Sequence, residues 1–220
     1  MSAVKAVIFD FDGVVADTES LYDTAERELF AVYGIEISAG ELLEIKGLSE
    51  KIFLDLLQKK YQINAPLNEI KDQCQTILRR IFVQELDYMP GFLSFYESVK
   101  MQFKIGMVTS SSRDLLEWIF ANTPVRNLFH TIITTEDTER GKPYPDPYLK
   151  MCQLLEVLPE NAIVIEDSVN GLRSAKAAGT ITIGFLSSFA AADLAEADYL
   201  ANDYSDLRLL LSNIVAGRKI

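Results

Sequence analysis

Five short apolar runs, rich in Val, Ile and Phe, constrain the fold of this chain more than any other feature of its sequence. They lie at residues 4–9, 103–110, 130–135, 162–167 and 180–185. The first, VKAVIF, is apolar enough for a strand buried on both faces, as in the middle of a parallel sheet. Helical stretches such as LLEWIFAN and PYLKMCQLLEV follow the second and third runs. This alternation predicts right-handed crossovers and an α/β fold with a doubly wound parallel sheet.

The interval between the first and second runs breaks this alternation. It holds about ninety residues without a convincing strand, far more than a single crossover helix needs. We therefore predict an inserted helical domain at residues 17–88, within a sheet domain formed by residues 1–16 and 89–220. The two linking segments, near 14–17 and 87–91, would act as a hinge.

Within the predicted insertion, three segments have helical character. The first begins near Thr18, a possible N-cap, and the others lie at 49–61 and 66–86. The first and third carry apolar residues at helical spacing, which predicts a buried stripe on each. These residues are Leu21, Ala25, Leu29, Val32 and Tyr33 in the first helix, and Leu67, Ile70, Cys74, Ile77, Leu78 and Ile81 in the third.

The composition and charge of the chain limit its partners and its compartment. Its 220 residues, 49% of them hydrophobic, are enough for one ample core with a smaller insertion. No apolar run is long enough to span a membrane, and the N-terminus lacks a signal-type apolar region. A net charge of -11 argues against nucleic acid or an anionic membrane as a partner. We expect a soluble cytoplasmic protein, either a monomer or a weak oligomer.

The cysteines and the single histidine argue against a disulfide and against a serine–histidine triad. Cys74 and Cys152 are far apart and form no CxxC pair, so we expect buried free thiols in a reducing compartment. His130 is the only histidine and lies outside the clusters of polar residues. We expect it to pack or to face solvent, which argues against a serine–histidine triad.

Polar residues follow several of the predicted strands, at the edge where ligands of open parallel sheets collect. Singly, each has a structural explanation, since Asp-Gly favours a turn and Thr or Ser can cap a helix. Together they place several carboxylates, hydroxyls and one lysine at a single edge. They are Asp10, Asp12 and Asp17 after the first run, Thr109 to Ser112 after the second, Lys142 in the loop after the third, and Glu166 and Asp167 after the fourth.

Carboxylates that converge in this way repel one another unless protons or a hard cation compensate. Mg²⁺ takes oxygen ligands of this kind. Carboxylates, together with one lysine, hydroxyls and helix N-termini, are the groups that phosphoryl transfer requires. The chain has neither a GxxxxGK[ST] loop nor a GxGxxG motif, so neither of these nucleotide sites is supported.

Without a base-activated serine, a carboxylate can serve as the nucleophile and form an aspartyl-phosphate. Asp10, at the end of the first predicted strand, is the candidate. Asp12 is two residues further on, where it could protonate the departing alcohol and then activate water. Asp17 is expected to fix the turn into the hinge.

Four motifs in order give the chain a resemblance to the haloacid dehalogenase superfamily, in its phosphatase and phosphomutase branch with a helical cap. The motifs are DxDGxxxDT at 10–18, Thr109 at the end of GMVT, Lys142 in GKPYPDPY, and Glu166 and Asp167 in IEDSVNG. This resemblance implies a Rossmann-like core with an inserted helical cap, and a bound Mg²⁺.

The resemblance also implies a role for each matching residue. Asp10 is the nucleophile and a magnesium ligand, and Asp12 is the acid and base, whose backbone carbonyl also meets the metal. Asp167 is a ligand, and Glu166 is a ligand or a partner of the ligands. Thr109, the backbone of Ser110, and Lys142 hold the transferring phosphate. Asn170 and Gly171 are assigned to the turn into the next helix.

Within the superfamily, the chain looks most similar to the β-phosphoglucomutase-like group, which includes sugar-phosphate phosphatases. The stretch IKGLSEK resembles the KGxSR loop of that group and makes Lys46 and Gly47 candidates for substrate binding. Glu50 stands where the mutase has an arginine that grips the distal phosphate, and Tyr22 stands where it has a histidine. A second phosphate beside Glu50 would be repelled. Lys46, Lys51, Arg79, Arg80 and Arg113 could supply another anchor, and the alternative for each is a surface charge, since helices commonly expose such residues.

The expected function is that of a magnesium-dependent phosphatase acting on a small phosphorylated metabolite such as a sugar phosphate. A cap that closes over the substrate would exclude bulk water. The nearest alternative is a β-phosphoglucomutase. Dehalogenation is a weaker alternative, because the displacement of halide without a metal leaves Asp12 with little purpose. A phospho-accepting receiver module and an inactive binding module are the non-enzymatic alternatives.

Overall fold

The structure is a computed structural model that describes residues 4–45, 48 and 50–218. By its internal contacts the chain divides into two compact units. Residues 1–17 and 87–220 form one, here called the sheet unit, and residues 18–86 form the other, the helical unit. Among the described residues, no helix has the length and apolar character that crossing a membrane requires.

The sheet unit contains, within its described residues, a six-stranded sheet in which neighbouring strands pair in parallel. The strand order is β3-β2-β1-β4-β5-β6, so the order reverses at β1, which confirms the predicted doubly wound sheet. The sixth strand was not predicted, because it has only three residues and lies in none of the five apolar runs. The strands are β1 (Ala6–Phe9), β2 (Lys104–Val108), β3 (Ile132–Ile133), β4 (Ala162–Glu166), β5 (Ile181–Phe185) and β6 (Tyr199–Ala201).

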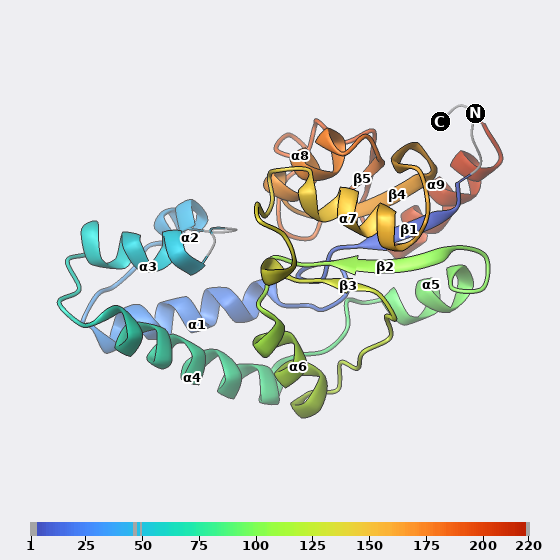
Figure 1. Ribbon diagram of the computed structural model, residues 1–220. Coiled ribbons are helices and arrows are strands. Elements are labelled where there is room, and N and C mark those ends of the chain that lie inside the picture. Colours follow the sequence, from blue (N-terminus) through green and yellow to red (C-terminus); the bar gives the residue numbers. More distant parts are fainter. Residues whose placement is uncertain (1–3, 46–47, 49, 219–220) are drawn as a thin grey trace. The chain divides into compact units, whose positions relative to one another are not determined.

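Helices cover both faces of this sheet. Figure 1 shows α7 and α8 together on one side of it, where Met151 and Ala175 join the apolar cluster formed with Ala6 and Ile8 of β1. On the other face the ring of Phe9 packs edge-on against those of two α5 residues. The helices of this unit are α5 (Phe92–Val99), α6 (Arg113–Asn122), α7 (Asp146–Leu154), α8 (Val169–Ala177) and α9 (Tyr204–Val215), with short 3₁₀ turns at Thr135–Asp137 and Pro159–Asn161.

The alternation of side chains along the central strands decides which polar groups meet. Ala6 and Ile8 of β1, and Ala162 and Val164 of β4, all contribute to the cluster under α7 and α8. Because side chains alternate with a period of two, the next residues of the same parity, Asp10 and Glu166, are directed to that side as well. The fold therefore turns two acidic side chains toward one pair of helices.

The helical unit contains α1 (Glu19–Val32), α2 (Ala39–Ile45), α3 (Glu50–Lys59) and α4 (Leu67–Glu85). Its two longest helices, α1 and α4, pack together, and the rings of Tyr22 and Phe82 meet edge-on at 5.5 Å between centroids. Arg80 of α4 forms an ion pair with Glu28 of α1. Only α2 was not predicted, because its seven residues give too short a pattern.

Four residues that were predicted to lie on the buried stripes of this unit are exposed or only partly buried. Val32 and Leu67 are 53% and 40% exposed, because they lie at the last position of α1 and the first of α4, where less of the neighbouring helix covers them. Cys74 and Tyr33 are only partly buried, and Tyr33 lies just after the end of α1. Thr18 is the N-cap residue of α1, as predicted, but its hydroxyl makes no capping hydrogen bond, because its backbone is helical rather than extended.

Candidate active site

Asp10 lies immediately after β1 and is 6% exposed. Its backbone N–H donates to the carbonyl oxygen of Ile165 at 3.0 Å, which continues the pairing of β1 with β4. Its carboxylate oxygen Oδ1 accepts a hydrogen bond from Nζ of Lys142 at 2.5 Å. The predicted nucleophile and the predicted phosphate-binding lysine are therefore in direct contact.

The Lys142 side chain is 5% exposed and comes from the loop before α7. Its Nζ donates to Oδ1 of Asp10 and Oε1 of Glu166, each at 2.5 Å, and to the carbonyl oxygen of Val108 at 3.2 Å. An ammonium has three N–H donors, so each has an acceptor. Burial opposes the charge on Lys142, but the charges of Asp10 and Glu166 outweigh it and raise the pKa well above its ordinary value. Lys142 is therefore a buried cation.

Glu166 is completely buried at the end of β4 and accepts four hydrogen bonds. Oε1 accepts from Lys142 and from the Tyr148 hydroxyl at 2.9 Å, while Oε2 accepts from the N–H and hydroxyl of Ser168 at 3.0 and 2.9 Å. A Cβ on Gly171 would lie 1.7 Å from Oε1. Only glycine at this position lets the first turn of α8 approach the carboxylate so closely.

Asp167 follows Glu166 and is 3% exposed. Its Oδ2 accepts hydrogen bonds from the hydroxyls of Ser187, at 3.2 Å, and Ser188, both from the loop after β5. Gly13 has a φ of +67°, and a Cβ there would lie 2.0 Å from the same Oδ2. Two loops therefore pack against Asp167, and the loop after β1 requires glycine at position 13 both for its backbone conformation and for its proximity to this carboxylate.

The remaining predicted residues of the sheet unit lie at the ends of β1 and β2. The Ser111 hydroxyl donates to Oδ2 of Asp12 at 3.0 Å, and the Ser111 N–H donates to the hydroxyl of Thr109 at 2.9 Å. Ser110, between them, is exposed. Asp17 is exposed too, and its N–H donates at 3.0 Å to the carbonyl oxygen of Asp87, which ties the two linking segments together.

Three of these acidic groups form a cluster that fits a metal ion. One carboxylate oxygen from each of Asp10, Glu166 and Asp167 lies within 4.8 Å of the others. Burial raises the pKa of Asp10 well above its ordinary value, and Glu166 and Asp12 add to this effect while Lys142 opposes it. Because one ammonium neutralises only one of three buried carboxylates, and hard cations prefer oxygen ligands, the set suits a divalent metal ion.

A comparison with protein families identifies the kind of protein that carries this site. The model of the haloacid dehalogenase-like hydrolases matches residues 7–185. The chain belongs to this family.

Similar proteins within this hydrolase family span most of the chain. A phosphorylated carbohydrates phosphatase of Thermotoga maritima is 33% identical over 178 residues, which cover 80% of this chain and 82% of that protein. The validoxylamine A 7'-phosphate phosphatase of Streptomyces hygroscopicus subsp. limoneus is 28% identical over 211 residues, which cover 93% and 96% of the two chains. The crystal structure of a β-phosphoglucomutase candidate from Thermotoga maritima matches with a TM-score of 0.78 at 30% identity, covering 95% of this chain and 99% of that one.

Several other candidates are not part of the cluster in this hydrolase. Lys46 and Gly47, and the side chains of Glu50 and Lys51, lie outside the described residues. Arg113 donates to the carboxylate of Asp137, so this candidate anchor has an acidic partner. The corresponding partner of Arg80 is Glu28 in the helical unit. His130 is exposed, as its isolation in the sequence led us to expect.

Sequence reasoning missed four polar residues that contact the acidic pair of this hydrolase. Tyr148 and Ser168 hold Glu166, and Ser187 and Ser188 hold Asp167. Ser168 could have been found, because a serine directly before a helix is a typical N-cap and its hydroxyl accepts from the N–H of Gly171. Ser187 and Ser188 follow the fifth predicted strand, and this position is the signal that could have found them.

Proposed function

We propose that this chain is a magnesium-dependent phosphatase that hydrolyses small phosphorylated metabolites, sugar phosphates in particular. The observation that carries the proposal is the contact between Lys142 and Asp10 within a group of buried carboxylates. The phosphorylated carbohydrates phosphatase of Thermotoga maritima supports this substrate class, being 33% identical over most of the chain. Neither Cys74 nor Cys152 forms a disulfide, which supports the further proposal that the enzyme works in a reducing compartment such as the cytoplasm.

In the proposed reaction an oxygen of the Asp10 carboxylate attacks the phosphorus atom of the substrate. A bond forms between this oxygen and phosphorus while the bond to the alcohol oxygen breaks, and Asp12 donates its proton to the departing alcohol. Asp12 then takes a proton from water, and the resulting hydroxide attacks the aspartyl-phosphate. This second step releases inorganic phosphate and restores both aspartates.

The other proposed residues hold the transferring group. Lys142, the Thr109 hydroxyl and the Ser110 N–H would bind its oxygens, and Lys46 and Gly47 would contact the rest of the substrate. The carboxylates of Asp10, Asp167 and Glu166, with the backbone carbonyl of Asp12, form the proposed ligand set for Mg²⁺. Bound Mg²⁺ would neutralise negative charge on the phosphate oxygens and on the cluster itself.

A phosphomutase is the second candidate, because the β-phosphoglucomutase candidate from Thermotoga maritima has a similar fold at 30% identity. Glu50 and Tyr22 argue against a mutase, because they stand where the mutase has an arginine and a histidine. Conversion of β-glucose 1-phosphate that depends on glucose 1,6-bisphosphate would favour the mutase.

The experiment that tests the proposed function is phosphate release from a panel of sugar phosphates and other metabolite phosphates. We expect turnover of one or more sugar phosphates with Mg²⁺ and its loss with a chelator. Turnover that persists after the chelator has removed all divalent metal would overturn the metal requirement, and no release from any member would overturn the phosphatase assignment.

A further inference from the structure

The Tyr148 hydroxyl is a polar group at the site to which none of the four sequence motifs assigns a role. The side chain is completely buried in α7, within the apolar cluster under β1 and β4. Its hydroxyl donates to Oε1 of Glu166 at 2.9 Å, and its ring centroid lies 5.4 Å from Nζ of Lys142. A phenylalanine would fill the same apolar space, so packing alone does not account for the hydroxyl.

We propose that Tyr148 is a positioning residue, whose hydroxyl orients the Glu166 carboxylate so that the Lys142 ammonium stays on Asp10. This inference rests on the proposed phosphatase function, in which Lys142 grips the transferring phosphate. It assigns Tyr148 no contact with the substrate, because its hydroxyl acts through Glu166.

The arrangement of donors around Glu166 explains how one hydroxyl has this effect. Ser168 holds Oε2 through two hydrogen bonds, whereas Tyr148 and Lys142 share Oε1. Without the hydroxyl, Oε1 keeps only its hydrogen bond from Lys142. The carboxylate can then rotate around Oε2, which Ser168 still holds. Lys142 then follows Glu166 and loses its fixed place 2.5 Å from Asp10. Residues that hold an active-site group without touching the substrate can tune the site strongly.

The Tyr148→Phe variant tests this role, and Tyr96→Phe is its matched control. Tyr96 is also buried, at 8% exposed, and its hydroxyl donates to the carbonyl oxygen of Leu128, a residue that contributes nothing to the cluster. Both variants remove one phenolic hydroxyl and keep the ring. A general loss of packing or stability therefore affects both of them.

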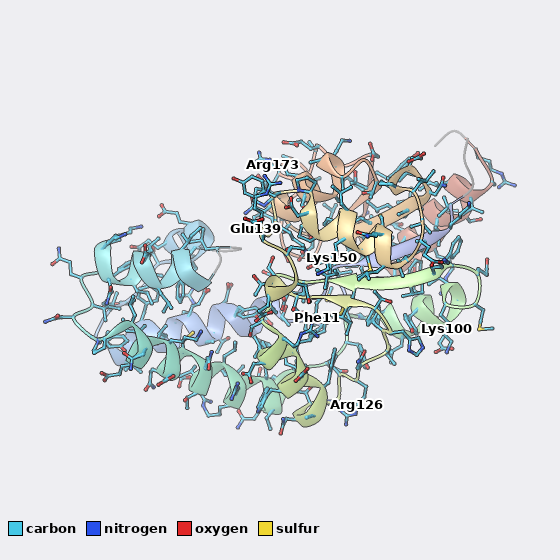
Figure 2. All side chains as sticks on the ribbon, viewed as in Figure 1. Phe11, Lys100, Arg126, Glu139, Lys150 and Arg173 are labelled. Atoms are coloured by element: carbon cyan, nitrogen blue, oxygen red, sulfur yellow. The ribbon has the colours of Figure 1, made fainter. Side chains whose placement is uncertain are left out.

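The first measurement does not depend on enzymatic activity. Acetylation of lysines with a limiting reagent is followed by mass spectrometry, peptide by peptide, in the metal-free protein. We expect Lys142 to react about tenfold faster in Tyr148→Phe than in Tyr96→Phe, because the ammonium is no longer held by three acceptors. Lys150, which donates from α7 to the carbonyl of Asp137 and is labelled in Figure 2, should react at the same rate in both variants. Equal rates at Lys142, or a rise shared by Lys150, would overturn the inference.

The second measurement compares the steady-state kinetics of a substrate that the wild-type protein hydrolyses. We expect Tyr148→Phe to lower kcat/KM about tenfold and to weaken inhibition by inorganic phosphate, with Tyr96→Phe within about twofold of wild type. Equal kinetics in the two variants would overturn the positioning role while leaving the phosphatase intact. If the wild type released no phosphate, the proposed function would fail and the acetylation rates would still decide whether Tyr148 holds Lys142.

Discussion

Nζ of Lys142 lies 2.5 Å from Oδ1 of Asp10, although 132 positions separate the two residues in the chain. One comes from the loop before α7 and the other from the tip of β1. The parallel sheet brings both to its carboxyl edge. Because both side chains are buried, the charge of each compensates the charge of the other. Each residue is therefore expected to affect the stability of the protein as well as its chemistry.

Replacing Lys142 by methionine should destabilise the metal-free protein. The substitution keeps much of the buried volume but leaves Asp10 and Glu166 without their shared cation, which costs about 3 to 5 kcal/mol for a buried pair. Urea unfolding of the chelator-treated protein measures this loss. Lys59→Met is the control, because the ion pair of Lys59 with Asp55 is largely exposed and should cost below about 1 kcal/mol. Equal losses in the two variants would contradict the buried pairing.

Replacing Gly13 by alanine should cost more than the same change at Gly34. Both residues have a positive φ, +67° and +72°, so both variants carry the backbone strain of about 1 kcal/mol. Only the Gly13 Cβ meets a side chain, Oδ2 of Asp167 at 2.0 Å, whereas Gly34 faces open space. We expect Gly13→Ala to lose about 2 kcal/mol more stability and to need at least tenfold more Mg²⁺ for half-maximal thermal stabilisation. A matching Mg²⁺ requirement in the two variants would show that this approach does not shape the metal site.

The two thiols should differ in reactivity. Burial raises the pKa of Cys152 to about 11 and leaves its side chain 2% exposed, while Cys74 is only partly buried. Because the thiolate is the reactive form, iodoacetamide at pH 8 should label Cys74 at least tenfold faster than Cys152 in the native protein. Mass spectrometry of the two peptides follows the rates, and unfolding in urea should remove the difference. Faster labelling of Cys152 under native conditions would be inconsistent with this structure.

The sequence predicted the central part of the fold because local patterns determine it. The alternation of β1 and β4 directs Asp10 and Glu166 to one side, and both positions follow from a period of two. The three-residue β6 and the seven-residue α2 were missed because patterns so short are not distinctive. Val32 and Leu67 were misassigned because their exposure depends on where the partner helix ends, which periodicity does not encode.

The candidate site shows the same division between local and distant information. Asp10, Lys142, Glu166 and Asp167 could be named because each follows a predicted strand or lies in a distinctive loop. The donor that Tyr148 provides could not be named, although Tyr148 ends the motif GKPYPDPY, because its hydroxyl reaches Glu166 only through the packing of α7 on the sheet.

The Asp198 carboxylate should make the stability of the sheet unit depend on pH. Burial alone would raise its pKa, but hydrogen bonds from Lys176 and Thr182 outweigh this and lower the pKa below its ordinary value of 3.8. A lowered pKa in the folded state adds stability above the unfolded value, and this contribution is lost as the pH falls through the folded value. Asp198→Asn should therefore cost about 1 kcal/mol at pH 7, with a smaller cost below pH 4. Urea midpoints of both proteins across this range give the difference, and a cost that grows toward acid pH would refute it.

The most direct test of the proposed mechanism asks whether Asp10 carries the phosphoryl group. The wild-type protein, Asp10→Asn and the exposed control Asp193→Asn are mixed with Mg²⁺ and a substrate found in the phosphate-release panel, quenched with acid within one turnover, and digested for mass spectrometry. We predict a phosphoryl group on Asp10 in the wild type and in Asp193→Asn, and neither this adduct nor turnover in Asp10→Asn. Undiminished phosphate release by Asp10→Asn, or a phosphoryl group on a different residue, would contradict the account.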